Sequence, residues 1–237
     1  MGRLLNVPAA CAAGLLGWIA SPALAASDSA PGRAAGEQGG LAPIDPATLH
    51  LEAGAVVPTG KTSFTIRDPG LRAVVPGSSG SSARLAFVYR GPTRKEAPLA
   101  SGELRRQIGL KLRSQDTCNI VYVMWHVAPD SGVHVQMKYN PGQKTHLDCL
   151  DRGYRTLPAR AHRDLPSIRS GERHELVARI DGRTLRVLAD GQPAWQGELP
   201  EQAFAFEGPV GIRSDNGEFD VELWGAAPSG LRGKNGP

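Results

Sequence analysis

The sequence predicts an all-β fold of antiparallel strands, and three observations support this. Residues 174–196, HELVARIDGRTLRVLADGQPAWQ, contain two Asp-Gly pairs, at Asp181 and Asp190, between apolar-rich runs. This pattern is typical of two-residue hairpin turns, in which both central residues have positive φ. Apolar residues also alternate with polar ones in residues 84–90, 103–113 and 133–140. The chain shows no long amphipathic helix pattern and no internal repeat.

The composition of the two ends sets them apart from the folded region. Arg3 precedes an apolar run that ends near Ala20 and is broken by Ser21-Pro22, and Ala23-Leu24-Ala25 then fits a small-x-small cleavage site typical of secretory signals. The segments that flank the strands are small, polar and rich in Gly and Pro, which predicts disorder. We therefore predict a secreted or periplasmic protein without a membrane span, cleaved near Ala25. Its segments are a signal peptide (1–25), a flexible leader (26–43), a β-sandwich domain (44–227) and a disordered tail (228–237).

The net charge and the cysteine content indicate which binding partners and which cellular compartment to expect. The formal net charge of +4 falls by one when Arg3 leaves with the signal. That excess is too small and too dispersed to indicate nucleic acid, although it permits an acidic glycan. Cys118 and Cys149 remain after cleavage, and an isolated pair in an exported chain most often forms a disulfide. We predict this disulfide, with a metal-binding or nucleophilic cysteine as the alternative.

The most apolar predicted hairpin defines a core face and a polar face. If Val127 pairs with Val133, then His126 opposes His134 and Tyr122 opposes Lys138. The side that must enter the core carries Val121, Val123, Trp125, Val133, Val135 and Met137. We expect the other side to be an exposed sheet face, continued by a neighbouring strand at residues 103–113. The predicted ligand-binding residues on it are Arg105, Gln107, Lys111, Tyr122, His126, His134, Gln136 and Lys138.

The order of strands from about residue 84 to 224 resembles the concanavalin A-like and laminin-G-like jelly rolls. In those domains an Asp-Gly hairpin carries a strand with Trp, here Trp195, and is followed by a Gly-Pro-Val-Gly-Ile strand, here from Gly208. A last strand, here ending at Trp224, closes the domain. The resemblance implies an antiparallel two-sheet jelly-roll sandwich. It leaves the chemistry open, because the fold hosts lectins, hydrolases, lyases and adhesion modules.

The polar face favours carbohydrate binding. In the resembling folds the concave sheet face often binds a polysaccharide, and this face offers hydrogen-bonding groups and an aromatic ring on a rigid sheet. Its Arg, Lys and His residues favour an anionic glycan, such as one of the cell envelope, bound by a non-catalytic, lectin-like module without a cofactor. The alternative is a merely solvated sheet face in a structural or adhesion domain.

A weaker resemblance links the chain to polysaccharide lyases of this fold, such as alginate lyases. Their Arg-x-Glu-Leu-Arg strand is matched by Glu103-Leu104-Arg105, and their strand ending in Gln-Ile-His is matched at His126, with Met124 in place of the Gln. The resemblance implies β-elimination on a uronate-containing glycan, a reaction that needs a base and an acid. The late strand that carries a catalytic Tyr in these lyases has none here, at residues 209–213.

The final strand carries a second enzyme-like pattern. Glu218, Asp220 and Glu222 resemble the Glu-x-Asp-x-Glu signature of retaining β-glucanases. Those enzymes need two carboxyl groups about 5–5.5 Å apart, whereas residues four apart on a regular strand are separated by roughly 13 Å. The alternative is an edge-like strand with Phe219 and its apolar neighbours turned inward.

The sequence leaves two further questions undecided, which are metal binding and the position of Trp195. His126 and His134 could supply two metal ligands near Asp148 and Asp151, but no third ligand is placed, and calcium has no supporting motif. Strand alternation puts Trp195 beside Arg186, away from the core, where it either stacks on a ligand or reveals an error of one residue in the predicted register.

Overall fold

The computed structural model describes residues 40–226, which form two antiparallel β-sheets of nine and seven strands. Sheet A has the order β11 (Ala161–His162), β14 (Gln192–Glu198), β13 (Thr184–Ala189), β12 (Arg173–Asp181), β6 (Ser79–Pro92), β16 (Gly217–Ala226), β4 (Ser63–Ile66) and β3 (Val57–Pro58), with β1 (Leu41–Pro43) paired to β16. Sheet B has the order β10 (Tyr154–Thr156), β9 (Gly132–Lys138), β8 (Ile120–Ala128), β7 (Arg106–Leu112), β15 (Gly211–Asp215), β5 (Gly70–Val74) and β2 (His50–Ala53). The connections contain η1 (Pro46–Thr48), α1 (His146–Cys149) and η2 (Glu201–Phe204).

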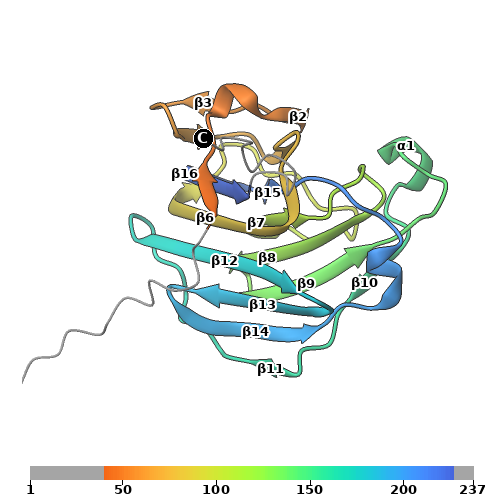
Figure 1. Ribbon diagram of the computed structural model, residues 1–237. Coiled ribbons are helices and arrows are strands. Elements are labelled where there is room, and N and C mark those ends of the chain that lie inside the picture. The colour runs from red at the N-terminus through yellow and green to blue at the C-terminus, as the bar shows by residue number, and fades with distance from the viewer. Residues whose placement is uncertain (1–39, 227–237) are drawn as a thin grey trace, which may run out of the picture. The chain divides into compact units, whose positions relative to one another are not determined.

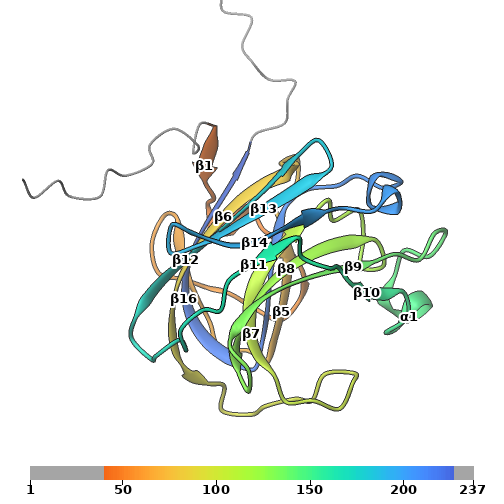
Figure 2. The same cartoon turned by 90° about the horizontal axis from the view of Figure 1, so that it is seen from below.

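The two sheets face each other as the layers of a sandwich (Figures 1 and 2). Trp125 of β8 meets Phe87 of β6 edge to face, with 5.7 Å between ring centroids, so the core lies between the sheets. Burial of a large apolar side chain stabilises the fold by about 1.5–3 kcal/mol. A slip of β8 by one residue would expose its whole apolar set and is therefore excluded. The predicted all-β, antiparallel two-sheet sandwich is confirmed.

The predicted core face of the β8–β9 hairpin is also confirmed. Val121, Val123, Trp125, Val135 and Met137 are buried, and Val133 is half-buried against the same core. The register differs from the predicted one by two residues, because His126 lies opposite Gly132 and Met124 opposite His134. A shift of two residues keeps every side chain on its predicted face.

The strands predicted in residues 174–196 are β12, β13 and β14. At the second turn Asp190 and Gly191 have φ angles of 50° and 75°, as the turn prediction requires. The first turn differs from the prediction. Gly182 has a positive φ, of 56°, but Asp181 does not, because it is the last residue of β12 and pairs with Thr184.

Trp195 belongs to the core, which corrects its predicted place beside Arg186. It lies opposite Val187 and is buried, and Gln196 lies opposite Arg186. An irregularity between Val187 and Leu188 shifts the register of β13 and β14 at this point.

The ordered strands begin earlier than predicted. Leu41–Pro43, which composition assigns to the flexible leader, form β1 and pair with the end of β16. The predicted signal peptide and tail, and residues 26–39 of the leader, lie outside the described residues. No helix within residues 40–226 is long and apolar enough to cross a membrane.

Cys118 and Cys149 form the predicted disulfide, with Cα atoms 5.9 Å apart. It fastens α1, in the long connection between β9 and β12, to the start of β8. For the sequence separation of 31 residues, the chain-entropy model gives a stabilisation of about 3.5–4 kcal/mol. The Asn119 side-chain amide also donates to the Gln143 carbonyl at 3.0 Å, so the first half of this connection is held against sheet B.

Candidate functional site

Three adjacent strands of sheet B bring a polar cluster together on the side that faces away from the core. Strand pairing places Arg213 of β15 opposite Arg72 of β5, and Asp215 of β15 opposite Gln107 of β7. Residues two apart on a strand point to the same face, so all four side chains meet. The Asp215 carboxylate accepts hydrogen bonds from Arg72 Nη2 at 3.0 Å, Arg213 Nε at 2.8 Å and Gln107 Nε2 at 2.7 Å.

The cluster is buried and carries an excess of positive charge. Asp215 is 2% exposed and Arg213 is 8% exposed. Burial alone would raise the pKa of Asp215, but Arg213 and Arg72 outweigh it and hold this pKa below its usual range. Burial would lower the pKa of Arg213, and Asp215 outweighs that effect and raises it. In the described part of the chain both arginines form their ion pairs with this single carboxylate, so the cluster of Arg72, Arg213 and Asp215 has a net charge of +1.

Two tyrosines stack beside the arginines. The rings of Tyr122 on β8 and Tyr154 on β10 have centroids 6.1 Å apart and an interplanar angle of 21°. The Arg213 guanidinium lies 5.1 Å from the Tyr122 ring centroid and donates from Nη1 to the Tyr154 hydroxyl at 3.3 Å. Tyr122 is buried, which raises its pKa. Tyr154 keeps 39% of its surface exposed and is therefore the accessible aromatic side chain of the pair.

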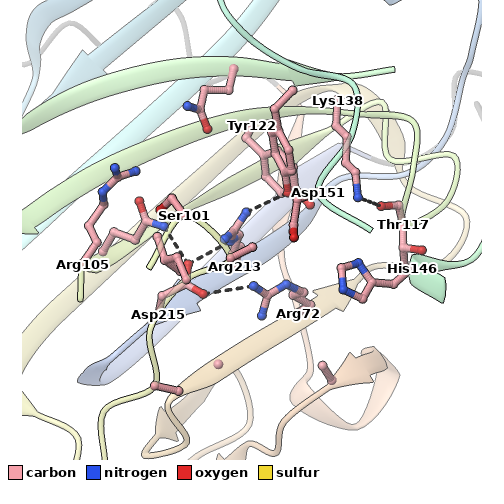
Figure 3. A pocket seen from close by; sticks show the side chains of 18 of the residues that line it. Arg72, Ser101, Arg105, Thr117, Tyr122, Lys138, His146, Asp151, Arg213 and Asp215 are labelled. Atoms are coloured by element: carbon pink, nitrogen blue, oxygen red, sulfur yellow. Dashed lines mark hydrogen bonds and ion pairs between the residues drawn. The ribbon is translucent and has the colours of Figure 1, made fainter. Parts of the chain in front are cut away.

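These residues line a pocket of about 780 Å³. In Figure 3, Arg105 and Ser101 lie at one end and His146 and Thr117 at the other, with Arg213 between Asp215 and Tyr122. The walls come from the connection between β6 and β7, the segment around β2 and β5, and the connection that contains α1. A volume of this size is within the range of about 300–1,000 Å³ found for small-ligand pockets.

The predicted polar face is the floor of this pocket. Five of the predicted binding residues line it: Arg105, Gln107, Tyr122, Gln136 and Lys138. Lys111, His126 and His134 share the face but are not part of the lining. The prediction of an exposed face was wrong, because most of these side chains are buried. Glu52 of β2 covers Lys111, and Tyr154 of the long connection covers Tyr122.

Lys111 and Lys138 are buried and each binds a neighbouring segment of the chain. Lys111 is fully buried and pairs with Glu52. Lys138 Nζ donates to the carbonyls of Thr117 at 3.2 Å and Leu150 at 2.6 Å, and so joins the same two segments as the disulfide. Burial lowers the pKa of both amines. Their contacts identify both lysines as supports of the pocket walls.

His126 and His134 form a stacked pair on adjacent strands. Their ring centroids are 3.9 Å apart and the interplanar angle is 16°. Burial, aided by His134 and Arg105, lowers the pKa of His126 to about 3. Burial and then Arg105 also lower the pKa of His134. Both rings are therefore neutral at pH 7.

The described residues assemble no metal centre around this pair. Residues 40–226 contain no group of three or more His, Cys, Asp or Glu side chains that could hold a metal ion. Asp148, one of the candidate ligands, instead accepts hydrogen bonds from the Thr145 backbone and hydroxyl at 3.0 and 2.7 Å, and so caps α1.

The acidic residues of the final strand lie on sheet A, away from the pocket lining. Asp220 accepts from Thr65 Oγ1 at 2.8 Å and Arg90 Nε at 2.7 Å, and Glu222 pairs with Arg173 at 3.0 Å. Phe219 and the apolar residues that alternate with the acids are buried. β16 is an interior strand between β4 and β6, not the edge-like strand of the sequence prediction.

The structure adds four site residues that sequence reasoning missed: Arg72, Tyr154, Arg213 and Asp215. Arg72 alternates with the buried Leu71 and Ala73 on β5, and that alternation was the available signal. Tyr154 lies on the three-residue β10 inside the long connection, where no periodic pattern marks it. Of the lyase-like residues, Glu103 and Arg105 pair with each other.

No family model and no curated protein matches the chain. Among solved structures, the carbohydrate-binding module CBM66 from Bacillus subtilis is similar, with 12% identity, coverage of 73% of this chain and 91% of that chain, and a TM-score of 0.52. The chain has a concanavalin A-like jelly-roll fold. Two further structures match this jelly roll at lower TM-scores. A putative glycosyl hydrolase from Parabacteroides distasonis has 8% identity, coverage of 76% and 88%, and a TM-score of 0.45. The Emp47p carbohydrate recognition domain has 10% identity, coverage of 77% and 89%, and a TM-score of 0.44.

Proposed function

We propose that the pocket on sheet B binds a carbohydrate without transforming it, and that the ligand is an anionic polysaccharide. The observation that carries the proposal is the position of an accessible ring, Tyr154, beside the Arg72–Arg213 pair. A sugar combines an apolar face that stacks on an aromatic ring with hydroxyl groups that need fixed hydrogen-bonding partners. The pocket offers both on a rigid sheet.

The preference for an anion follows from the charge of the floor. Arg72 and Arg213 share one carboxylate, so a second anion at this position would balance the cluster. Arg72 is the more accessible of the two, with 31% of its side chain exposed. Its planar guanidinium matches the geometry of a carboxylate, as in a uronic acid.

The proposed setting is outside the cytoplasm. The predicted signal peptide would export the chain, and the Cys118–Cys149 disulfide fits an oxidising compartment. A cell-envelope polysaccharide is the ligand that an exported protein of this kind would meet. The similarity in fold to a carbohydrate-binding module supports carbohydrate as the class of ligand.

A binding screen of the mature protein tests the proposal. The anionic probes are tetragalacturonate, an alginate tetrasaccharide and a heparosan tetrasaccharide, and the neutral probe is cellotetraose. We expect at least one anionic probe to bind and cellotetraose not to bind. Tyr154→Ala should weaken binding by about three- to tenfold through loss of the stacking surface. His162→Ala, which removes an exposed ring on sheet A, is the control. Failure of all anionic probes, or equal binding of cellotetraose, would contradict the proposal.

One observation favours polysaccharide lyase activity as a second candidate. Arg213 donates to the Tyr154 hydroxyl, which places a tyrosine in the pocket although the late strand carries none. β-Elimination needs a base for the proton next to the carboxylate and an acid for the leaving oxygen. Incubation with the same uronate probes, followed by ultraviolet absorbance of the unsaturated product, decides between the two. Product formation that Tyr154→Phe abolishes would establish the lyase and overturn the non-catalytic reading.

A further inference from the structure

One wall of the pocket is a loop whose two ends both accept hydrogen bonds from one side chain, that of Asn216. This wall loop, residues 97–105, contributes to the lining Ala97, Pro98, Leu99, Ala100, Ser101 and Arg105. Asn216 Oδ1 accepts a hydrogen bond from Ala97 N at 2.8 Å. Asn216 Nδ2 donates to the carbonyls of Ala97 at 2.8 Å and Arg105 at 3.1 Å. One amide group therefore fixes both ends of this loop, which runs from β6 of sheet A to β7 of sheet B.

Asn216 is itself rigidly placed. It is completely buried, its backbone N–H donates to the Pro69 carbonyl at 2.9 Å, and its carbonyl accepts from Thr93 N at 3.1 Å. Its φ of 57° lies in the left-handed region, which Asn tolerates better than most residues other than Gly. The side-chain amide is thus presented from a fixed backbone position.

The backbone hydrogen bonds in the middle of the wall loop are made within the loop itself. Its backbone closes on itself through Leu99 N to the Glu103 carbonyl at 2.9 Å and Gly102 N to the Leu99 carbonyl at 2.7 Å. An Arg106–Glu96 ion pair at 2.6 Å also brackets the loop. That pair is bidentate and partly exposed, so it also helps to hold the ends of the loop, whereas the hydrogen bonds of Asn216 are buried and bind the loop backbone directly.

The same turn also builds the floor. Asp215, the neighbour of Asn216, holds Arg72, Arg213 and Gln107 in place. We propose that Asn216 is a positioning residue for carbohydrate binding, which sets the wall loop at the correct distance from the arginine floor. This inference rests on the proposed function. A sugar on the floor contacts a wall that is already in place, and so loses less entropy on binding than it would against a mobile loop.

Asn216→Gly isolates the effect of the side chain. Glycine adopts the positive φ without strain, so the turn is kept while the three hydrogen bonds to the wall loop are removed. Arg113→Gly is the matched control. Arg113 also has a positive φ, of 47°, and its side chain donates to the carbonyls of Ala203 and Phe206 in a connection that does not line the pocket.

The test combines hydrogen exchange of the free protein with affinity for tetragalacturonate and the alginate tetrasaccharide. In Asn216→Gly we expect faster exchange of the Leu99 and Gly102 amides and about five- to tenfold weaker binding. The salt dependence of binding should equal that of the wild type, because no charge changes. Arg113→Gly should alter neither the exchange of the wall loop nor the affinity.

Three outcomes would overturn the inference or its basis. Unchanged exchange of the wall loop in Asn216→Gly shows that Asn216 does not hold it. Faster exchange with wild-type affinity shows that the position of the loop does not matter for binding; both results leave the proposed function standing. A wild-type protein that binds neither probe overturns the proposed function for these ligands, and the exchange data then decide alone whether Asn216 positions the loop.

Discussion

Arg72 and Arg213 lie directly opposite each other on adjacent strands and share the carboxylate of Asp215. Like charges at directly opposed positions of an antiparallel pair destabilise a sheet. Asp215, which is nearly completely buried, offsets this repulsion and leaves the cluster of these three side chains with a net charge of +1. The stability of the sheet and the charge of the pocket thus depend on the same carboxylate.

Replacing Asp215 by Asn should destabilise the protein strongly, because two guanidinium groups would lose their anion in a buried site. The expected loss in free energy of unfolding is about 3–5 kcal/mol, measured by urea denaturation at pH 7. Asp220→Asn is the control, since its pair with Arg90 is partly exposed and should be worth less than about 1 kcal/mol. Equal losses in both variants would contradict the role assigned to Asp215.

The same carboxylate predicts a pH dependence of stability. The folded-state pKa of Asp215 is depressed, so its stabilising effect is complete above the unfolded value of about 3.9 and is lost as pH falls through the folded value. The stability difference between the wild type and Asp215→Asn should therefore shrink as the pH is lowered below about 4. A difference that does not change with pH would contradict the ionised state of Asp215.

His126 predicts a second pH window. Its folded pKa of about 3 lies below the unfolded value of about 6.5, so the unfolded chain binds a proton that the folded protein rejects between these values. Stability is complete above about pH 6.5 and falls as the pH decreases toward about 3. His126→Gln should flatten this fall in thermal unfolding scans, while His162→Gln on sheet A should not. An unchanged slope in His126→Gln would contradict the burial of a neutral imidazole.

The disulfide should matter to both stability and the pocket. Reduction should lower the free energy of unfolding by roughly 3.5–4 kcal/mol. It should also speed hydrogen exchange in residues 141–153, although Lys138 and Asn119 still hold that segment. The double variant Cys118→Ser and Cys149→Ser should show no further response to reductant. A melting temperature that reductant leaves unchanged would refute the stabilising role.

The acids of the final strand should not support glucan hydrolysis. Asp220 and Glu222 are in ion pairs on sheet A, outside the pocket lining. We expect no release of reducing sugar from mixed-linkage β-glucan, and Glu218→Gln should not change binding of any glycan. Hydrolysis that disappears in Glu218→Gln would make the final strand an active site.

Strand alternation was enough to predict the faces of sheet B but not its register. Apolar residues at every second position of β8 and β9 fix which side of the sheet each residue faces, and Gln107, Tyr122 and Gln136 lie on the predicted side. A shift by two residues buries the same apolar side chains, so alternation alone could not distinguish the predicted pairing from the observed one. Trp195 escaped prediction for a related reason, because the irregularity after Val187 has no alternation signal.

The rest of the site depends on contacts between segments that are distant in sequence. Arg72 and Asp215 are 143 residues apart in the sequence, and they are in contact because β5 and β15 are adjacent strands of sheet B. Tyr154 reaches Arg213 across 59 residues from the long connection. Glu52 and Tyr154, which cover part of the predicted face, also come from segments distant in sequence. The prediction of an exposed face was wrong because local sequence patterns do not show which distant segment will cover a sheet.

The most direct test of the account is the affinity for tetragalacturonate or the alginate tetrasaccharide at low and high salt, by titration calorimetry. The comparison includes the wild type, Arg72→Ala and Arg186→Ala, which removes an exposed arginine from sheet A. The account predicts that salt weakens wild-type binding, that Arg72→Ala loses about tenfold in affinity and part of the salt dependence, and that Arg186→Ala resembles the wild type. Salt-insensitive binding, or equal affinities for Arg72→Ala and the wild type, would contradict a pocket that holds an anionic sugar on its arginine floor.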